Sequence, residues 1–343
     1  IVHCNDWQAG LVPALLSLET NRPATIFTIH NLAYQGLFPA SQVDTLNLPG
    51  KLWHPDGLEF NHMLSFIKGG LAFADRITTV SPTYAAEIQT PAFGYGLEGL
   101  LQYRANALTG IINGIDTELW GAETDKYIKK TFTVTRLVDK KINKAELQQR
   151  FGLPAEERIP MFALISRLVE QKGIDLLLDC LPEMMAMKLQ LVLLGAGDKV
   201  FEQRLQAVAE AHPDKFALTL GYDEALAHQI EAGADIFLMP SKFEPCGLNQ
   251  MYSQRYGTIP IVRKTGGLAD TVVDATLENV ADKTASGIVF GDISSGSLME
   301  AIKRVLWIYQ DQKVWAQMQA TAMKKDFSWR NSAEQYLRLY DEL

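Results

Sequence analysis

Short apolar runs alternate with amphipathic segments along almost the whole chain, and this alternation limits the folds open to it. The apolar runs have the length of buried strands, and the segments between them have helical periodicity. Strands that alternate with helices are joined by right-handed crossovers, which gives a parallel sheet covered by helices. In the second half we predict strands at 161–166, 189–194, 216–220, 236–240 and 259–262, with helices at 174–187, 199–211, 225–234 and 247–256.

The first half alternates less regularly. We predict strands at 1–4, 24–29 and 77–81, a strand and turn at 111–115, and helices at 7–18, 64–74 and 82–88. Residues 121–144 are polar and charged, which indicates an irregular connector, and helices at 298–309, 314–323 and 332–343 finish the chain. With 343 residues there is room for two α/β domains. We place them at 1–115 and 116–327, with a terminal helical segment at 328–343.

Charge and cysteine content exclude several classes of protein. The formal net charge is -8, which argues against a general nucleic-acid or membrane surface. No apolar run is long enough to span a bilayer. The three cysteines are widely spaced, which fits a reducing cytoplasm without disulfides, and none has metal-ligand spacing. We therefore expect a cytoplasmic protein with no metal and no cofactor.

The most informative motif runs from Ser241 to Gln250, with a second glycine-rich turn at 265–270. It places one carboxylate, Glu244, in a turn between an apolar strand and a helix that we expect to begin near Cys246. Free N–H groups at such a helix start can hold phosphates, and the carboxylate can hold sugar hydroxyls. The alternative is that Glu244 only caps its own helix, although Glu-Pro-Cys-Gly is a poor capping box.

Arg167 and Lys172 lie on either side of a predicted strand-to-helix turn. Two cations five residues apart can reach one diphosphate and neutralise it as a leaving group without a metal. The alternative, about as probable for this motif alone, is a solvated loop with two surface charges.

In the first half, Asp6, His30 and Asn31 follow predicted strands. A histidine at the carboxyl end of a strand can hydrogen-bond a sugar hydroxyl, but a partly buried structural histidine is the more common case. For Asp6, capping of the following helix is a strong alternative.

Three weaker signals remain. Gly195-Ala-Gly197 is a fragment of a phosphate loop, and it lacks the full dinucleotide fingerprint, so a nicotinamide-dependent dehydrogenase is a weak rival. Tyr222 can stack on a nucleobase or be an ordinary exposed aromatic residue. Cys246 has no companion histidine in its motif, so we favour close packing near a ligand over nucleophilic catalysis.

Together these motifs resemble the bacterial glycogen synthases and plant starch synthases, which add glucose from ADP-glucose to α-1,4-glucans. The resemblance runs from His3 to the C-terminus. Its ordered matches include Asp6-Trp7, Thr28–Gly36, Val80–Tyr84, Gly94–Gly99, Asn113–Asp116, Ser166–Gly173, Gly195–Asp198, Pro240–Leu248, Tyr256–Asp270 and Asp326–Trp329.

The resemblance implies two facing doubly wound, Rossmann-like domains of the glycosyltransferase B type, with the active site in the cleft between them and the last helix returning to the first domain. It implies that His30 lies over the sugar, that Arg167 and Lys172 hold the diphosphate, and that Glu244 contacts the glucose hydroxyls. Further donor-binding residues would be Asp6, Asn113, Gly195, Tyr222, Cys246, Gly247, Leu248, Asn249, Thr265, Gly266 and Gly267, with Asn31 and Tyr34 on the acceptor side.

The family opens its first domain with a Lys-x-Gly-Gly-Leu loop, which is absent here, and the chain starts with Ile1 on a predicted interior strand. We therefore expect the first domain to be incomplete. The resemblance also implies transfer with retention at the anomeric carbon. Two alternatives stay open: a transferase of the same fold that uses UDP-glucose or another acceptor, and a fragment that binds nucleotide or glucan without turnover.

Overall fold

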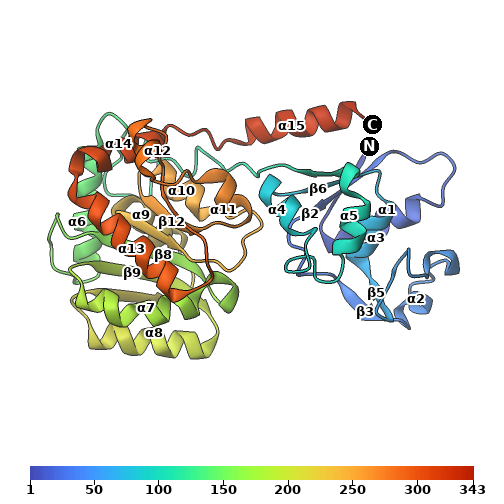
Figure 1. Cartoon of the computed structure of the whole chain (residues 1–343), viewed down its shortest axis with the longest axis horizontal. Coiled ribbons are helices and arrows are strands. Elements are labelled where there is room, and N and C mark those ends of the chain that lie inside the picture. The colour runs from blue at the N-terminus through green and yellow to red at the C-terminus, as the bar shows by residue number, and fades with distance from the viewer. The chain divides into compact units, whose positions relative to one another are not determined.

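Figure 1 shows the computed structural model, which describes residues 1–343 and divides into two units. Unit 1 consists of Ile1–Gly114 together with Trp329–Leu343, and unit 2 consists of Ile115–Ser328. Each unit has its own parallel sheet. None of the helices has the length and apolar character needed to cross a bilayer.

Unit 2 is built on a six-stranded sheet in the order β10-β9-β8-β11-β12-β13, and every pair of neighbours is parallel. The strands are β8 (Met161–Leu168), β9 (Gln190–Gly197), β10 (Phe216–Leu220), β11 (Ile236–Met239), β12 (Ile259–Arg263) and β13 (Ile288–Phe290). In chain order this is 3-2-1-4-5-6, the doubly wound order, in which the direction of winding reverses between β8 and β11. The predicted parallel sheet is confirmed, and its ligand crevice is expected at the carboxyl ends of these two strands.

Alternation along the strands divides the core of unit 2 into two layers. In β8, Phe162 and Leu164 pack with one hydrophobic cluster, while Met161 and Ala163 pack with another on the opposite face. The first cluster takes in α7 (Ile174–Ala186), α8 (Lys199–Ala211), α13 (Ser295–Gln310) and α14 (Gln312–Met323), and the second takes in α6 (Lys140–Arg150), α9 (Glu224–Gly233) and α11 (Gly266–Thr271). Short helices α10 (Asn249–Arg255) and α12 (Leu277–Ala281) complete the unit.

Side-chain caps set where several of these helices begin. Asp198 accepts a hydrogen bond from the N–H of Val200 before α8, and Asp223 accepts one from Leu226 before α9, at 2.8 and 2.9 Å. Each cap satisfies an N–H group that lacks a partner within the helix.

Unit 1 contains the parallel sheet β1-β2-β6-β7, formed by Val2–Asn5, Thr25–Ile29, Arg76–Thr79 and Leu108–Gly110. A small antiparallel sheet, β3-β5-β4, is formed by Leu37–Pro39, Met63–Ser65 and Glu59–Phe60. The helices of unit 1 before its last segment are α1 (Leu11–Leu16), α2 (Gln42–Thr45), α3 (Phe66–Phe73), α4 (Pro82–Glu87) and α5 (Glu98–Tyr103), with 3-10 turns at Trp7–Ala9, Gly50–Leu52 and Ala105–Ala107.

The last helix, α15 (Trp329–Asp341), belongs to unit 1. Its Leu339 packs with Ile26 and Ile111, and its Tyr340 hydroxyl lies 2.8 Å from Nδ1 of His3. The terminal segment is thus fastened to the edge of the first sheet by both apolar and polar contacts.

The structure corrects several predicted elements. The strand expected at 111–115 is wrong, because the strand here is β7 at Leu108–Gly110, and the helix expected at 64–74 begins only at Phe66 because Leu64 pairs with Phe38 in the small antiparallel sheet. The helix expected at 7–18 is divided into a 3-10 turn and α1. The connector expected at 121–144 is wrong at its end: Leu137–Asp139 form a 3-10 turn and α6 starts at Lys140. Lys140 and Lys144, which fall within that expected connector, are buried.

Candidate functional site

A pocket of ≈350 Å³ lies where β8 and β11 end, at the reversal point of the unit 2 sheet. It brings together six of the predicted site residues: Arg167, Lys172, Glu244, Gly247, Leu248 and Asn249. The adjacent carboxyl ends of two parallel strands therefore collect motifs that lie more than seventy residues apart in the sequence.

Lys172 and Glu244 are joined directly. Nζ of Lys172 lies 2.5 Å from Oε2 of Glu244, and the side chains are 19% and 8% exposed. The hydroxyl of Ser241 donates to the same carboxylate oxygen at 3.0 Å. The carboxylate is therefore held in one orientation by a cation and a hydroxyl, and the sequence had not indicated this pairing.

The backbone around Glu244 is packed too closely for a side chain at two glycines. A Cβ at Gly266 would lie 1.9 Å from the main-chain oxygen of Glu244, and Gly266 has φ of 42°. A Cβ at Gly173, where φ is 70°, would lie 2.0 Å from the main-chain oxygen of Pro240. Both turns need glycine because of backbone conformation and close approach.

Residues that the sequence had not singled out hold the 241–244 loop in place. Nε of Arg263 donates to the carbonyl of Ser241 at 3.0 Å, and a second nitrogen of the same guanidinium donates to the carbonyl of Lys242. The side-chain amide of Gln171 donates to the carbonyl of Phe243 at 3.3 Å. The spacing Ser-x-x-Glu was the one local signal for Ser241, whereas Arg263 had none because its contact is tertiary.

The start of α10 differs from the prediction. The helix begins at Asn249 rather than near Cys246, and no acceptor in the structure receives the N–H groups of Gly247 and Leu248. Both residues line the pocket, so these donors lie beside it. The side chain of Asn249 donates to the carbonyl of Ile165 at 2.7 Å and so ties the helix start to β8.

The other predicted residues of unit 2 lie outside this pocket's lining. Gly195 is a buried residue of β9 rather than part of a loop, where a Cβ would lie 2.1 Å from the main-chain oxygen of Ser166. Tyr222 follows β10 and is 85% exposed. Cys246, Thr265, Gly266 and Gly267 form the packed wall behind Glu244, where a Cβ at Gly267 would meet the carbonyl of Cys246 at 2.2 Å.

In unit 1, Asp6 and His30 follow the neighbouring strands β1 and β2. Asp6 has φ of 62° and accepts a hydrogen bond from the N–H of Trp7 at 3.1 Å, so it does cap the turn that follows. Burial raises the pKa of Asp6, and the N–H groups of Trp7 and His30 partly offset this. Nε2 of His30 lies 2.9 Å from the side-chain oxygen of Asn5. A strained non-glycine residue at a strand end is typical of functional sites.

Unit 1 has a pocket of ≈540 Å³ that is rich in aromatic side chains: its lining includes Trp7, Tyr34, Phe60 and Tyr95. Tyr34 is 51% exposed. Asn31 shapes the turn that presents Tyr34, because its side chain accepts the N–H of Ala33 at 3.0 Å and its carbonyl accepts that of Tyr34. Flat aromatic faces beside polar groups suit a polyhydroxylated ligand.

Asn113 follows β7 and is half-buried. No group of three or more His, Cys, Asp and Glu side chains in the structure is placed to hold a metal ion.

Residues 1–103 match the family described as "Starch synthase catalytic domain", and residues 145–322 match "Glycosyl transferases group 1". The chain is 57% identical to "Glycogen synthase 1" of Methylococcus capsulatus over 342 residues, which cover 100% of this chain and 69% of that protein. It is 54% identical to "Glycogen synthase" of Thioalkalivibrio sulfidiphilus over 344 residues, 100% of this chain and 71% of that protein.

Among solved structures, the catalytic domain of Starch Synthase IV from Arabidopsis thaliana, described as bound to ADP and acarbose, matches with a TM-score of 0.93 and 37% identity. The match covers 99% of this chain and 72% of that one.

Proposed function

The chain belongs to the glycogen and starch synthase family of glycosyltransferases, and we propose that it transfers glucose from ADP-glucose to the non-reducing end of an α-1,4-glucan with retention. The observation that carries the proposal is the pocket at the reversal point of the unit 2 sheet. There Arg167, Lys172 and Glu244 converge beside two N–H groups that have no acceptor.

Each group in this pocket matches a part of a nucleotide sugar. Arg167 and Lys172 supply the positive charge that a diphosphate needs in a protein of net charge -8. The N–H groups of Gly247 and Leu248 add donors for phosphate oxygens. Glu244 accepts hydrogen bonds from glucose hydroxyls, and Tyr222, whose ring is exposed, stacks on the adenine. The relative from Arabidopsis, described as bound to ADP, supports the choice of nucleotide.

The pocket favours front-face transfer over double displacement. Glu244 is the one carboxylate among the residues that line it, whereas retaining glycosidases need two carboxyl groups about 5–5.5 Å apart. The acceptor hydroxyl therefore attacks on the side from which the diphosphate departs, and a phosphate oxygen takes its proton. The protein contributes cations at the leaving group and the Glu244 carboxylate near the positively charged sugar.

Unit 1 supplies the acceptor-binding groups in this proposal. The aromatic pocket at Trp7 and Tyr34 offers ring faces for the glucose units of a glucan. In this proposal His30 binds the transferred sugar and Asp6 contributes to donor binding, as the resemblance implies. The description of a relative as bound to acarbose supports a carbohydrate ligand. We further propose that the protein acts in the cytoplasm, where its three free, buried thiols stay reduced.

Parallel assays with two donors test the proposal. Release of ADP from ADP-glucose, and of UDP from UDP-glucose, is measured with maltooligosaccharides as acceptors, and the product anomer is read by NMR. We expect faster turnover with ADP-glucose and an α-linked product. Faster turnover with UDP-glucose would overturn the choice of donor, and ADP binding without any glucose transfer would show that the chain only binds.

A further inference from the structure

Unit 2 has another pocket, at the opposite end of its sheet from Arg167 and Glu244. Its volume is ≈670 Å³, about twice that of the pocket at the reversal point. Arg158 and Asp235, which precede β8 and β11, line it together with side chains from α6, α13 and α14. It therefore belongs to the amino ends of the strands, and nothing in the proposed transfer reaction uses it.

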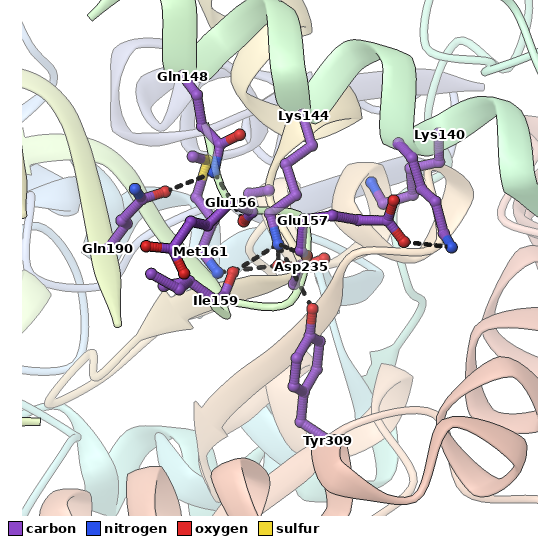
Figure 2. Close-up of polar contacts among 12 residues, drawn as sticks. Lys140, Lys144, Gln148, Glu156, Glu157, Ile159, Met161, Gln190, Asp235 and Tyr309 are labelled. Atoms are coloured by element: carbon purple, nitrogen blue, oxygen red, sulfur yellow. Dashed lines mark hydrogen bonds and ion pairs between the residues drawn. The ribbon is translucent and has the colours of Figure 1, made fainter. Parts of the chain in front are cut away.

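The most buried cation here, Lys144, is fully partnered. Figure 2 shows Lys140, Lys144 and Gln148 projecting from the same side of α6, at intervals of four residues. Nζ of Lys144 lies 2.6 Å from Oδ2 of Asp235 and also contacts the carbonyls of Glu157 and Ile159 at 2.8 and 2.5 Å. Lys144 is thus a structural group whose charge is balanced.

Two other cations in the lining have no carboxylate partner. Lys140 is 5% exposed, and its Nζ donates to the carbonyls of Glu231 and Ala232 and to the hydroxyl of Thr258. These acceptors are neutral. Arg158 is exposed, donates no hydrogen bond and lies within ion-pair distance of no carboxylate. The fourth cation, Lys141, is paired with Glu157 at 2.5 Å. Four cations and two carboxylates leave a surplus of two positive charges in the pocket.

The neutral part of the lining offers hydrogen bonds as well. Trp315 is 3% exposed and lines the pocket, and its indole N–H has no acceptor within the structure. Gln312 and Gln319 use their amide N–H groups on the carbonyls of Tyr309 and Gly257, so their amide oxygens remain as acceptors. An N–H donor and two amide oxygens suit a ligand with hydroxyl groups.

We propose that this pocket is a second ligand site, for a small polyhydroxylated phosphate monoester. A phosphate monoester carries about -1.5 to -2 charges at neutral pH, which matches the surplus of two that the lining has when Lys140 is charged. Arg158 pairs with the phosphate oxygens, for which a guanidinium fork is well suited. Lys140, whose donors are all used, acts through its charge, while Trp315 and the glutamine oxygens bind the hydroxyls. The volume lies within the range of small-molecule sites.

Burial of Lys140 adds a pH signature. Burial lowers the pKa of Lys140 to about 7; the neighbours Glu231 and Asp235 oppose this, and Lys144 reinforces it. Glu231 is a weak counter-ion, because burial raises its own pKa and neither of its oxygens has a partner. The ring of Phe132 also lies close to Lys140, with its centre 5.6 Å from Nζ. A bound dianion favours the charged lysine, so binding should take up protons at pH 8, where the ester, with a second pKa of about 6, is already a dianion.

Calorimetric titration tests the proposal, with inorganic phosphate, glycerol 3-phosphate and a hexose monophosphate as probes. We expect saturable binding of the esters, tighter than that of phosphate, and tighter at pH 7 than at pH 8. Arg158→Ala should weaken binding roughly tenfold or more, as expected for a charged hydrogen bond. Arg204→Ala is the matched control, because Arg204 is also an exposed arginine without a hydrogen-bond or ion-pair partner but lies on α8, away from the lining.

A fluorescence experiment checks the location independently. Binding of the hexose monophosphate beside Trp315 should change the tryptophan fluorescence of the protein. Trp315→Phe should weaken this binding and remove the fluorescence change, whereas Trp307→Phe, at a residue that is 68% exposed, should do neither. Affinity for ADP should be unchanged in Arg158→Ala, which separates this site from the donor pocket. Absence of saturable ester binding, or binding that is insensitive to both Arg158→Ala and Trp315→Phe, would overturn the proposal and leave the transferase assignment untouched.

Discussion

Replacement of Lys172 should lower both kcat and the stability of the fold, for two different reasons. The lysine is proposed to bind the departing diphosphate, and it also pairs with a buried carboxylate. Its Nζ lies 2.5 Å from Oε2 of Glu244, and after Lys172→Ala the hydroxyl of Ser241, at 3.0 Å, would be the one remaining side-chain donor to that oxygen. The substitution therefore removes a cation from the pocket and leaves a carboxylate that is 8% exposed without its counter-ion.

The expected loss of activity follows from the charge on the departing diphosphate. Removing one preorganised donor to a developing negative charge costs about 2.7–4 kcal/mol, which lowers kcat by roughly two to three orders of magnitude. The expected loss of stability follows from the carboxylate. An unpaired buried polar group costs about 1–3 kcal/mol, and we expect the lower part of this range because the lysine is 19% exposed and water can replace it. Each kcal/mol lowers Tm by about 2–4 °C in a unit of this size.

The double variant Lys172→Ala/Glu244→Gln separates the two effects. It removes the unpaired charge, so Tm should recover toward that of the wild type while kcat stays low. Lys188→Ala is the control, because Lys188 is 76% exposed and its pair with Glu156, at 3.3 Å, is solvated and contributes little. The assays are ADP release with maltooligosaccharide and thermal melting.

Two results would refute this reasoning. A kcat for Lys172→Ala within about threefold of the wild type would exclude a role for the lysine at the leaving group. A double variant that melts no higher than Lys172→Ala would show that the ion pair does not hold Glu244 in the folded protein.

Three further outcomes are expected. Gly266→Ala should weaken ADP binding and lower Tm, since its Cβ would lie 1.9 Å from a main-chain oxygen, whereas Gly291→Ala, with nothing within 4 Å of the added Cβ, should do neither. Asp235→Asn should lower the free energy of unfolding by about 3–5 kcal/mol in a denaturant titration, because it breaks the buried pair with Lys144. Hydrogen bonds from the guanidinium of Arg22 hold the pKa of Asp75 well below its usual 3.8. The contribution of the ionised Asp75 to folding stability is therefore present above pH 4 and is lost as the pH falls further. Asp75→Asn should show a shallower acid-induced loss of stability, measured by denaturant titration at several pH values.

The class of fold and the sheet of unit 2 can be predicted from the amino-acid sequence alone. Apolar runs of strand length separated by helical periodicity led to a parallel α/β sheet, and β10 and α8 were predicted with the bounds that the structure has. These elements are well marked because buried parallel strands are continuously apolar and because caps such as Asp198 lie next to the helices that they start. The strand-end rule likewise predicts that Arg167, Lys172 and Glu244 lie at one edge of the sheet.

The contacts of those residues follow only from the folded structure. Whether Lys172 pairs with Glu244, whether Arg263 holds the loop of Ser241, and whether Gly195 lies in a strand depend on chain segments that meet only after folding. The lysines of α6 are the clearest case: by sequence they fell in an expected irregular connector, yet Lys144 is buried against Asp235, 91 residues away. Local sequence reports the propensity and periodicity of a segment, whereas the burial and pairing of a charge depend on which distant groups surround it.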